Sequence, residues 1–267
     1  MNEPQRFQEI IQHGGPPLIS DGAMGTLLNA RGISFEQSFD SLNLINPALV
    51  AQIHREYIDA GSTMIQTNTF SANRFKLALH GQEHLLREIN KAGVELARRV
   101  VLASFKDVLI AGDIGPLGVR LAPFGRVQPE QAYQVFSEQI SSLAEAGVDL
   151  LIIETMTDLF ELDEAIRAAR EAVGPDFPLM EDAAGMYDYL TAIAAGQELQ
   201  RLGYTWFEEP IPDRQGEQLR RLADQLPAGE RRVAALGDDL IGGVDKLTLR
   251  VNDGHACQHP AFIDAFL

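Results

Sequence analysis

The sequence has very few residues of the kinds that build disulfides, nucleic-acid surfaces or membrane spans. Only Cys257 is a cysteine among 267 residues, which excludes an internal disulfide framework and any site built from several thiolates of this chain. Basic residues number 22 against 38 acidic ones, and the net charge of -16 argues against nucleic acid or anionic membranes as partners. The chain contains no run of about 18 apolar residues and opens without an apolar leader. We therefore expect a cytoplasmic protein that acts on a small molecule.

Short apolar segments alternate with stretches of helical periodicity along the whole chain. The segments begin near residues 18, 63, 108, 148, 177, 204, 232 and 246, and each ends in polar or acidic residues. This alternation predicts an α/β protein with one domain over residues 1–267, a closed (β/α)8 TIM barrel. A doubly wound open sheet is the alternative, but it does not need a polar residue at the end of every strand.

Two neighbouring segments end in carboxylates. Asp182 closes the segment that begins at residue 177, and Glu208 with Glu209 closes the next one. Parallel strands joined by helices bring such ends to one edge of a sheet. Clustered carboxylates repel each other unless a proton or a cation relieves them, so this edge is a candidate site for Mg²⁺ or Mn²⁺. The alternative interpretation is a set of acidic strand ends tolerated at a wet barrel mouth.

Four motifs in the first two thirds of the chain resemble those of the homocysteine S-methyltransferases in order and spacing. They are Asp-Gly-Ala-Met-Gly-Thr at 21–26, Thr-Asn-Thr-Phe-Ser-Ala-Asn at 67–73, Gly-Asp-Ile-Gly-Pro at 112–116 and Glu-Thr-Met at 154–156. The resemblance covers residues 6–180 and is nearest to the homocysteine-binding module of the methionine synthases. It implies that the C-terminal ends of the strands hold homocysteine. The residues that it places near the polar end of this amino acid are Asp21, Gly22, Ala23, Met24, Asn68 and Glu154.

The resemblance also implies a zinc ion held by three cysteines, which favours the thiolate form of the substrate at neutral pH. This chain departs from that pattern. Glu208 and Glu209 stand where the family has a cysteine, and the loop at 254–257 reads Gly-His-Ala-Cys. A single thiol does not make a three-thiolate Zn²⁺ site, so we expect methyl transfer to be impaired or absent.

From about residue 178 the chain resembles the enolase superfamily. The motifs are residues 179–193 and 202–210, and the resemblance makes Asp182 and Glu208 the first two metal ligands. Asp238 is the best candidate for the third, with Glu230 as the competing one. Residues 1–176 and 177–267 are therefore interpreted as the two halves of a chimeric barrel, natural or engineered.

The catalytic candidates in the second half are Glu209, Arg250 and Cys257. Arg250 stands where the enolase superfamily often has a lysine base, and an arginine that stays protonated is a poor base. Three functions stay open: an impaired homocysteine S-methyltransferase-like barrel, a Mg²⁺-dependent lyase or racemase, and a chimeric scaffold without turnover. The histidines at 13, 54, 80 and 84 fall on helical stretches, and we expect them at the surface.

Overall fold

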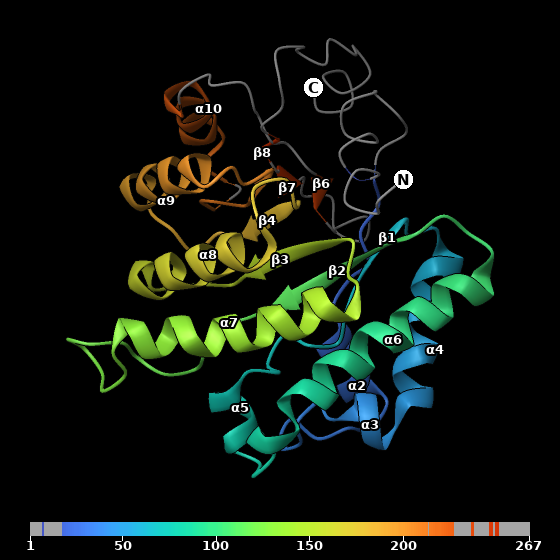
Figure 1. Cartoon of the computed structure of the whole chain (residues 1–267). Helices are drawn as coiled ribbons and strands as arrows, with labels where there is room; N and C mark the ends of the chain where they lie inside the picture. The colour runs from blue at the N-terminus through green and yellow to red at the C-terminus, as the bar shows by residue number, and fades with distance from the viewer. Residues whose placement is uncertain are drawn as a thin grey trace.

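The computed structural model describes residue 7 and residues 18–212, 214–226, 236–237, 246–247 and 249–250. Its centre is a sheet of parallel strands that pair in chain order (Figure 1). These strands are β1 (Met64–Gln66), β2 (Leu109–Ile114), β3 (Leu150–Glu154), β4 (Leu179–Asp182) and β5 (Trp206–Glu208). Ser20 adds a parallel bridge to Met64, so the first expected strand lies beside β1. The strand order is that of consecutive strand–helix units and confirms the predicted α/β fold class.

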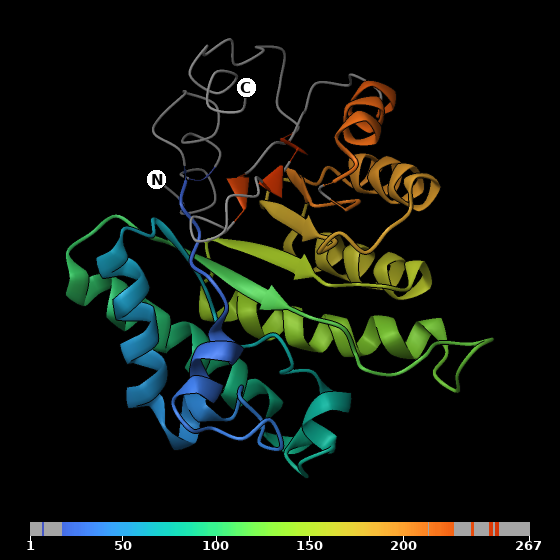
Figure 2. The same cartoon turned by 180° about the vertical axis from the view of Figure 1, so that it is seen from behind.

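Helices connect the strands and form a layer along one face of the sheet. They are α2 (Met24–Ala30), α3 (Leu42–Ile45), α4 (Pro47–Ala60), α5 (Arg74–Ala78), the 3-10 helix η1 (Glu83–Leu85), α6 (Leu86–Ser104), α7 (Pro129–Ala146), α8 (Leu159–Val173), α9 (Tyr189–Arg201) and α10 (Gly216–Gln225). Figure 2 shows the sheet from the opposite side, with α7 and α8 behind the strands. The helices α6, α7, α8 and α9 contact one another in chain order.

Local sequence signals set the ends of several helices. Pro47 and Pro129 occupy first turns, where the missing N–H is not needed. Gly61 and Gly147 end the same two helices in the left-handed region, at φ 118° and 89°. The sequence predicts a helical stretch at 74–106 that is interrupted near Gly81, and Gly81 has a φ of 67° between α5 and η1. These boundaries confirm the helices expected from the sequence pattern.

One local expectation is wrong. The spacing of Asp158 and Glu161 predicts that the two side chains cap the start of α8 reciprocally. The Asp158 carboxylate does accept a hydrogen bond from the Phe160 N–H, at 2.9 Å. Glu161 instead accepts a 2.6 Å hydrogen bond from the Leu117 N–H, in the loop after β2. Asp158 therefore caps α8 as expected, while a contact with a distant segment has replaced the Glu161 half of the reciprocal cap.

The two faces of the sheet carry two separate apolar layers. The helix-covered face packs strand residues such as Ile65, Ile110 and Ile153 against the helices. The other face, which would line the inside of a barrel, carries a smaller buried cluster: Met64, Leu109, Ala111, Leu150, Ile152 and Met180, together with Phe7. Strands buried on both faces explain why their sequences are nearly continuous apolar runs.

The last two expected strands pair differently from the prediction. β8 (Leu249–Arg250) is antiparallel to β5, and β6 (Leu236–Gly237) is antiparallel to β7 (Lys246–Leu247). Parallel pairing of these segments was expected and is wrong for the described residues. Only residues 238–245 separate β6 from β7, which is too short for a crossover connection between parallel strands. Closure of the barrel onto its first strand falls outside the described residues.

Candidate active site

The C-terminal edge of the sheet is here called the mouth. Carboxylates from neighbouring strands form a row along it. Glu154 pairs in register with Asp182, and Asp182 pairs in register with Glu208. Parallel strands lie about 4.8 Å apart, and residues in register point to the same face. The mouth therefore brings together three of the acids expected from the sequence. Asp113 on β2 pairs with Ile152, which places it on the same face one step deeper than Glu154.

Asp113 is a buried acid of the mouth and was not among the expected site residues. Its side chain is 7% exposed. Burial raises the pKa of Asp113 well above the usual range, and the nearby charges of Glu154, Asp40 and Asp21 raise it further. Burial also raises the pKa of Glu154, while hydrogen bonds with Asp113 and Thr155 oppose that shift. Both shifts favour protonation of the pair, and they are strongest at Asp113.

Two further buried acids surround this pair. The Asp21 carboxylate accepts the Gln66 N–H through both oxygens at 3.0 Å, so it lies across the end of β1. The Asp40 carboxylate accepts the Ser71 N–H at 2.9 Å, and burial raises the pKa of Asp40 to about 6. Asp40 precedes α3 in the chain, and no sequence motif pointed to it. The first half of the mouth is thus a cluster of four acids.

The other residues expected to bind substrate lie near this cluster. Asn68 is buried and donates its amide hydrogens to the Phe39 carbonyl at 2.8 Å and to Asn43 Oδ1 at 3.1 Å. Its side-chain nitrogen therefore joins the end of β1 to the segment that leads into α3. Gly22 and Ala23 follow Asp21 as a short loop, and Met24 begins α2. The roles assigned to these residues stay predictions.

The backbone is strained just beyond three neighbouring strands. Thr155, Ala184 and Glu209 have φ values of 63°, 49° and 39°, in the left-handed region. Such conformations cost about 1–3 kcal/mol for residues other than glycine and collect at functional sites. Hydrogen bonds between the strand ends hold them, including one of 2.8 Å from the Thr155 N–H to the Asp182 carbonyl.

The acid next to Asp182 belongs to the helix layer. Glu181 is completely buried and accepts a 3.0 Å hydrogen bond from the Tyr187 hydroxyl. Burial and the charges of Asp182 and Glu208 raise the pKa of Glu181 well above its usual range. The alternation of side chains along a strand explains why two consecutive acids have such different surroundings.

The catalytic and metal candidates of the second half are only partly described. Glu209 is half-buried after β5, and Arg250 pairs through its backbone with Trp206. Asp238, Glu230 and Cys257 lie outside the described residues. Within the described part of the chain, no group of three or more His, Cys, Asp or Glu side chains is arranged to hold a metal ion. A three-cysteine zinc site also does not fit this chain, because its sequence has one cysteine.

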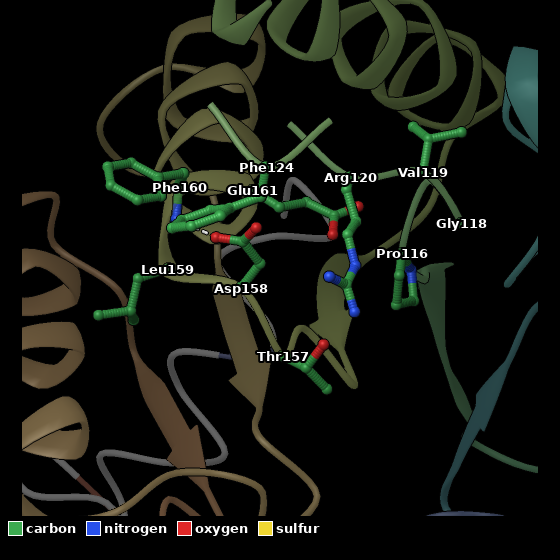
Figure 3. Close-up of a pocket in the computed structure, with 10 residues that line it drawn as sticks. All are labelled: Pro116, Gly118, Val119, Arg120, Phe124, Thr157, Asp158, Leu159, Phe160 and Glu161. Atoms are coloured by element: carbon green, nitrogen blue, oxygen red, sulfur yellow. Dashed lines mark hydrogen bonds between the residues drawn. The ribbon is translucent and has the colours of Figure 1, made fainter. Parts of the chain in front are cut away.

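A cleft of about 530 Å³ opens beside the mouth, between the loops that follow β2 and β3 (Figure 3). Arg120 points into it between Pro116 and Thr157, and the exposed ring of Phe160 lies on its far side. The remaining lining residues are Gly118, Val119, Phe124, Asp158, Leu159 and Glu161. The part of the chain that the structure describes has no helix long and apolar enough to cross a membrane.

Comparisons with known proteins identify relatives of the first two thirds of the chain. The family model for homocysteine S-methyltransferase matches residues 18–204. The methionine synthase of Mycobacterium tuberculosis (strain ATCC 25618 / H37Rv) is 30% identical over 165 residues, which cover 58% of this chain. That of Mycobacterium leprae (strain TN) is 28% identical over 165 residues and 58% of this chain. The match spans 14% of the length of each of these relatives.

Solved structures show the same likeness in three dimensions. The metallated form of the homocysteine methyltransferase MmuM from Escherichia coli has a TM-score of 0.63 and 21% identity, covering 77% of each chain. This similarity confirms the predicted TIM-barrel fold class. A member of the enolase superfamily from Salmonella Typhimurium also matches, at 25% identity over 36% of this chain and 29% of the other. Its TM-score of 0.30 is too low to support a structural argument.

Proposed function

The chain belongs to the homocysteine S-methyltransferase family, and from this premise we propose that the mouth of its barrel binds homocysteine. The observation that carries the proposal is the cluster of acids at the ends of neighbouring strands, inside the matched region. An ammonium group binds best where negative charge and hydrogen-bond acceptors meet in a partly buried place. Asp21 and Glu154 supply such acceptors.

The remaining polar end of the amino acid would lie against the loop after the first strand. Gly22, Ala23 and Met24 would provide backbone groups there, and Asn68 would contribute from the end of β1. The thiol of the substrate would then point toward the second half of the mouth, where Asp182 and Glu208 lie.

We expect methyl transfer by this chain to be impaired or absent. The nucleophile in such a reaction is a thiolate, and a free thiol with a pKa near 8.5 is mostly protonated at neutral pH. The family resemblance implies that three cysteines and zinc correct this, whereas the chain offers Cys257 alone. We interpret the replacement of the zinc half as the result of a chimeric origin.

The first experiment measures homocysteine binding by calorimetric titration, with and without Zn²⁺. Wild-type protein should bind without zinc. Glu154→Gln should weaken binding about tenfold or more, because a hydrogen bond to a charged group is worth about 1.5–3 kcal/mol. The control is Glu217→Gln, which changes an exposed acid of α10 that pairs with Arg221. An unchanged affinity in Glu154→Gln would show that the amino-group site is wrong.

A second candidate function rests on the register of Asp182 with Glu208, which places two carboxylates side by side as a Mg²⁺-dependent lyase or racemase needs. Titration with Mg²⁺ alone tests it. Binding that Asp182→Asn abolishes would favour this candidate, with Asp238 as the third ligand. Equal Mg²⁺ binding by both proteins, or none by either, would remove it and leave homocysteine binding or an inert scaffold.

A further inference from the structure

We propose that Asp113 is a positioning residue that acts as a neutral carboxylic acid: it donates its proton in a hydrogen bond to Glu154 and fixes the direction of that carboxylate in the mouth. The inference rests on the proposed function only for the identity of the ligand, an ammonium group. The shared proton itself is a property of the free protein.

The backbone of Asp113 is held rigidly by the neighbouring motif. Its N–H donates to Thr67 Oγ1 at 3.1 Å, and its carbonyl accepts from Thr69 Oγ1 at 2.8 Å. The two threonine hydroxyls are themselves 2.6 Å apart and hydrogen-bonded. The register with β3 then directs the side chain toward Glu154 on the inner face of the sheet. Asp113 therefore has little freedom to turn away from its neighbour.

The surroundings of the Asp113 carboxyl group favour its protonated, neutral form over the ionised carboxylate. Its Oδ1 is buried and accepts no hydrogen bond from any described residue. Its charged neighbours, Glu154, Asp21 and Asp40, are themselves acids, and Lys76 acts on Asp40. A buried carboxylate without a donor or a cation is very costly, and protonation removes the cost. The proton also turns the repulsion between Asp113 and Glu154 into a hydrogen bond.

A second buried acid of the same sheet shows the opposite arrangement. Asp149, at the other end of β3, is completely buried and pairs with Arg98 at 3.1 Å. It also accepts a 2.6 Å hydrogen bond from the Ile110 N–H. The protein thus supplies a cation and a backbone donor where a buried carboxylate has a structural task. Among the described residues no such cation or backbone donor is found for the Asp113 carboxyl group, which distinguishes it from Asp149.

The shared proton leaves Glu154 as the charged acceptor that a ligand meets in the mouth. Glu154 keeps its negative charge for the ammonium group, while one of its oxygens is engaged by Asp113. The pair together carries one negative charge, which matches one ammonium. Two ionised acids would instead favour a doubly charged cation.

Infrared difference spectroscopy of the free protein tests the shared proton. The spectrum of wild type minus that of Asp113→Asn, at pH 7, should show the carbonyl stretch of a protonated carboxylic acid. The same subtraction made in the Glu154→Gln background should still show this band, at a shifted frequency, because the hydrogen-bond acceptor of the Asp113 proton has changed. Asp149→Asn is the matched control, whose difference spectrum should show carboxylate bands only. A wild-type minus Asp113→Asn spectrum with carboxylate bands alone would overturn the proposal.

Homocysteine affinity tests the positioning role. Asp113→Asn can still donate a hydrogen bond and should keep the dissociation constant within about threefold of wild type. Asp113→Leu has a similar size but no donor, and it should raise the constant about tenfold or more. Equal losses in both variants would overturn the positioning role. If wild type itself binds no homocysteine, the proposed function fails, and the infrared bands then decide the Asp113–Glu154 pair by themselves.

Discussion

At the residue scale, ionisable side chains are buried outside the mouth as well. His54 on α4 was expected at the surface, and this is wrong, since its side chain is completely buried and both ring nitrogens lack hydrogen-bond partners among the described residues. The reason is that α4 contacts both α2 and α6, so more than one of its faces is covered. His80 and His84 are exposed as expected.

The state of His54 predicts a specific loss of stability in acid. Burial lowers the pKa of His54 to about 4, below its usual value of 6.5. Between these two pH values the unfolded chain binds a proton at His54 that the folded chain does not bind. The free energy of unfolding therefore falls as the pH drops from 6.5 to 4, by up to about 3 kcal/mol. Urea unfolding at several pH values should show a smaller loss in His54→Leu than in wild type. Identical pH dependence in the two proteins, or an equal change in the exposed control His80→Leu, would contradict this.

At the element scale, the sequence motifs are joined by direct contacts between the loops that follow the strands. The Gly115 N–H donates to the Phe70 carbonyl at 2.9 Å, which joins the loops after β1 and β2. A Cβ atom on Gly115 would lie 2.5 Å from the Phe70 ring. The close packing of the Phe70 ring therefore requires a glycine at position 115.

This contact predicts the effect of one added methyl group. Gly115→Ala should lower the free energy of unfolding by about 1–3 kcal/mol, because the ring of Phe70 must move. Chemical denaturation measures the change. Gly216→Ala is a suitable control, since an added Cβ there meets nothing within 4 Å at the start of α10. A Gly115→Ala protein as stable as the Gly216→Ala protein would show that the two loops are not closely packed.

Sequence reasoning works at this scale wherever the signal is local. Apolar runs located β1 to β5, and proline and glycine located the ends of α4 and α7. It missed Asp40 and Asp113, because their meeting depends on loops folding over the mouth and not on any spacing in the chain. It also misassigned Glu161, whose partner Leu117 is far away in the sequence. The acids at the strand ends of the candidate site were thus predictable, whereas the more deeply placed Asp40 and Asp113 were not.

At the scale of the whole molecule, the inner face of the sheet needs a cover. Phe7 is completely buried and packs with the inner cluster that contains Met64, Leu109 and Ile152. The alternating pattern of strands and helices predicted the parallel order of the sheet correctly. It could not predict how the last strands pair, because two-residue strands carry almost no periodic signal.

The position of Phe7 predicts that the chain needs its N-terminal segment for stability. Phe7→Ala should lower the free energy of unfolding by about 3–5 kcal/mol, through lost apolar burial and the cavity left behind. Urea denaturation followed by far-UV circular dichroism gives the value. Phe105→Ala, which alters a side chain that is 98% exposed, should have little effect. Similar stabilities of the two variants would argue against a role for Phe7 in covering the sheet.

The pairing of β4 with β3 has a consequence for insertions and deletions. Side chains alternate along a strand, so a shift of β4 by one residue would turn Asp182 toward α9 and Glu181 toward the mouth. The mouth would keep a carboxylate, now on a longer side chain, while the helix layer would receive a shorter acid near Tyr187. Loop-length variants between residues 174 and 178 would therefore preserve the charge of the mouth and change its reach. The consecutive acids make this strand a natural place to vary the size of the site without altering its electrostatics.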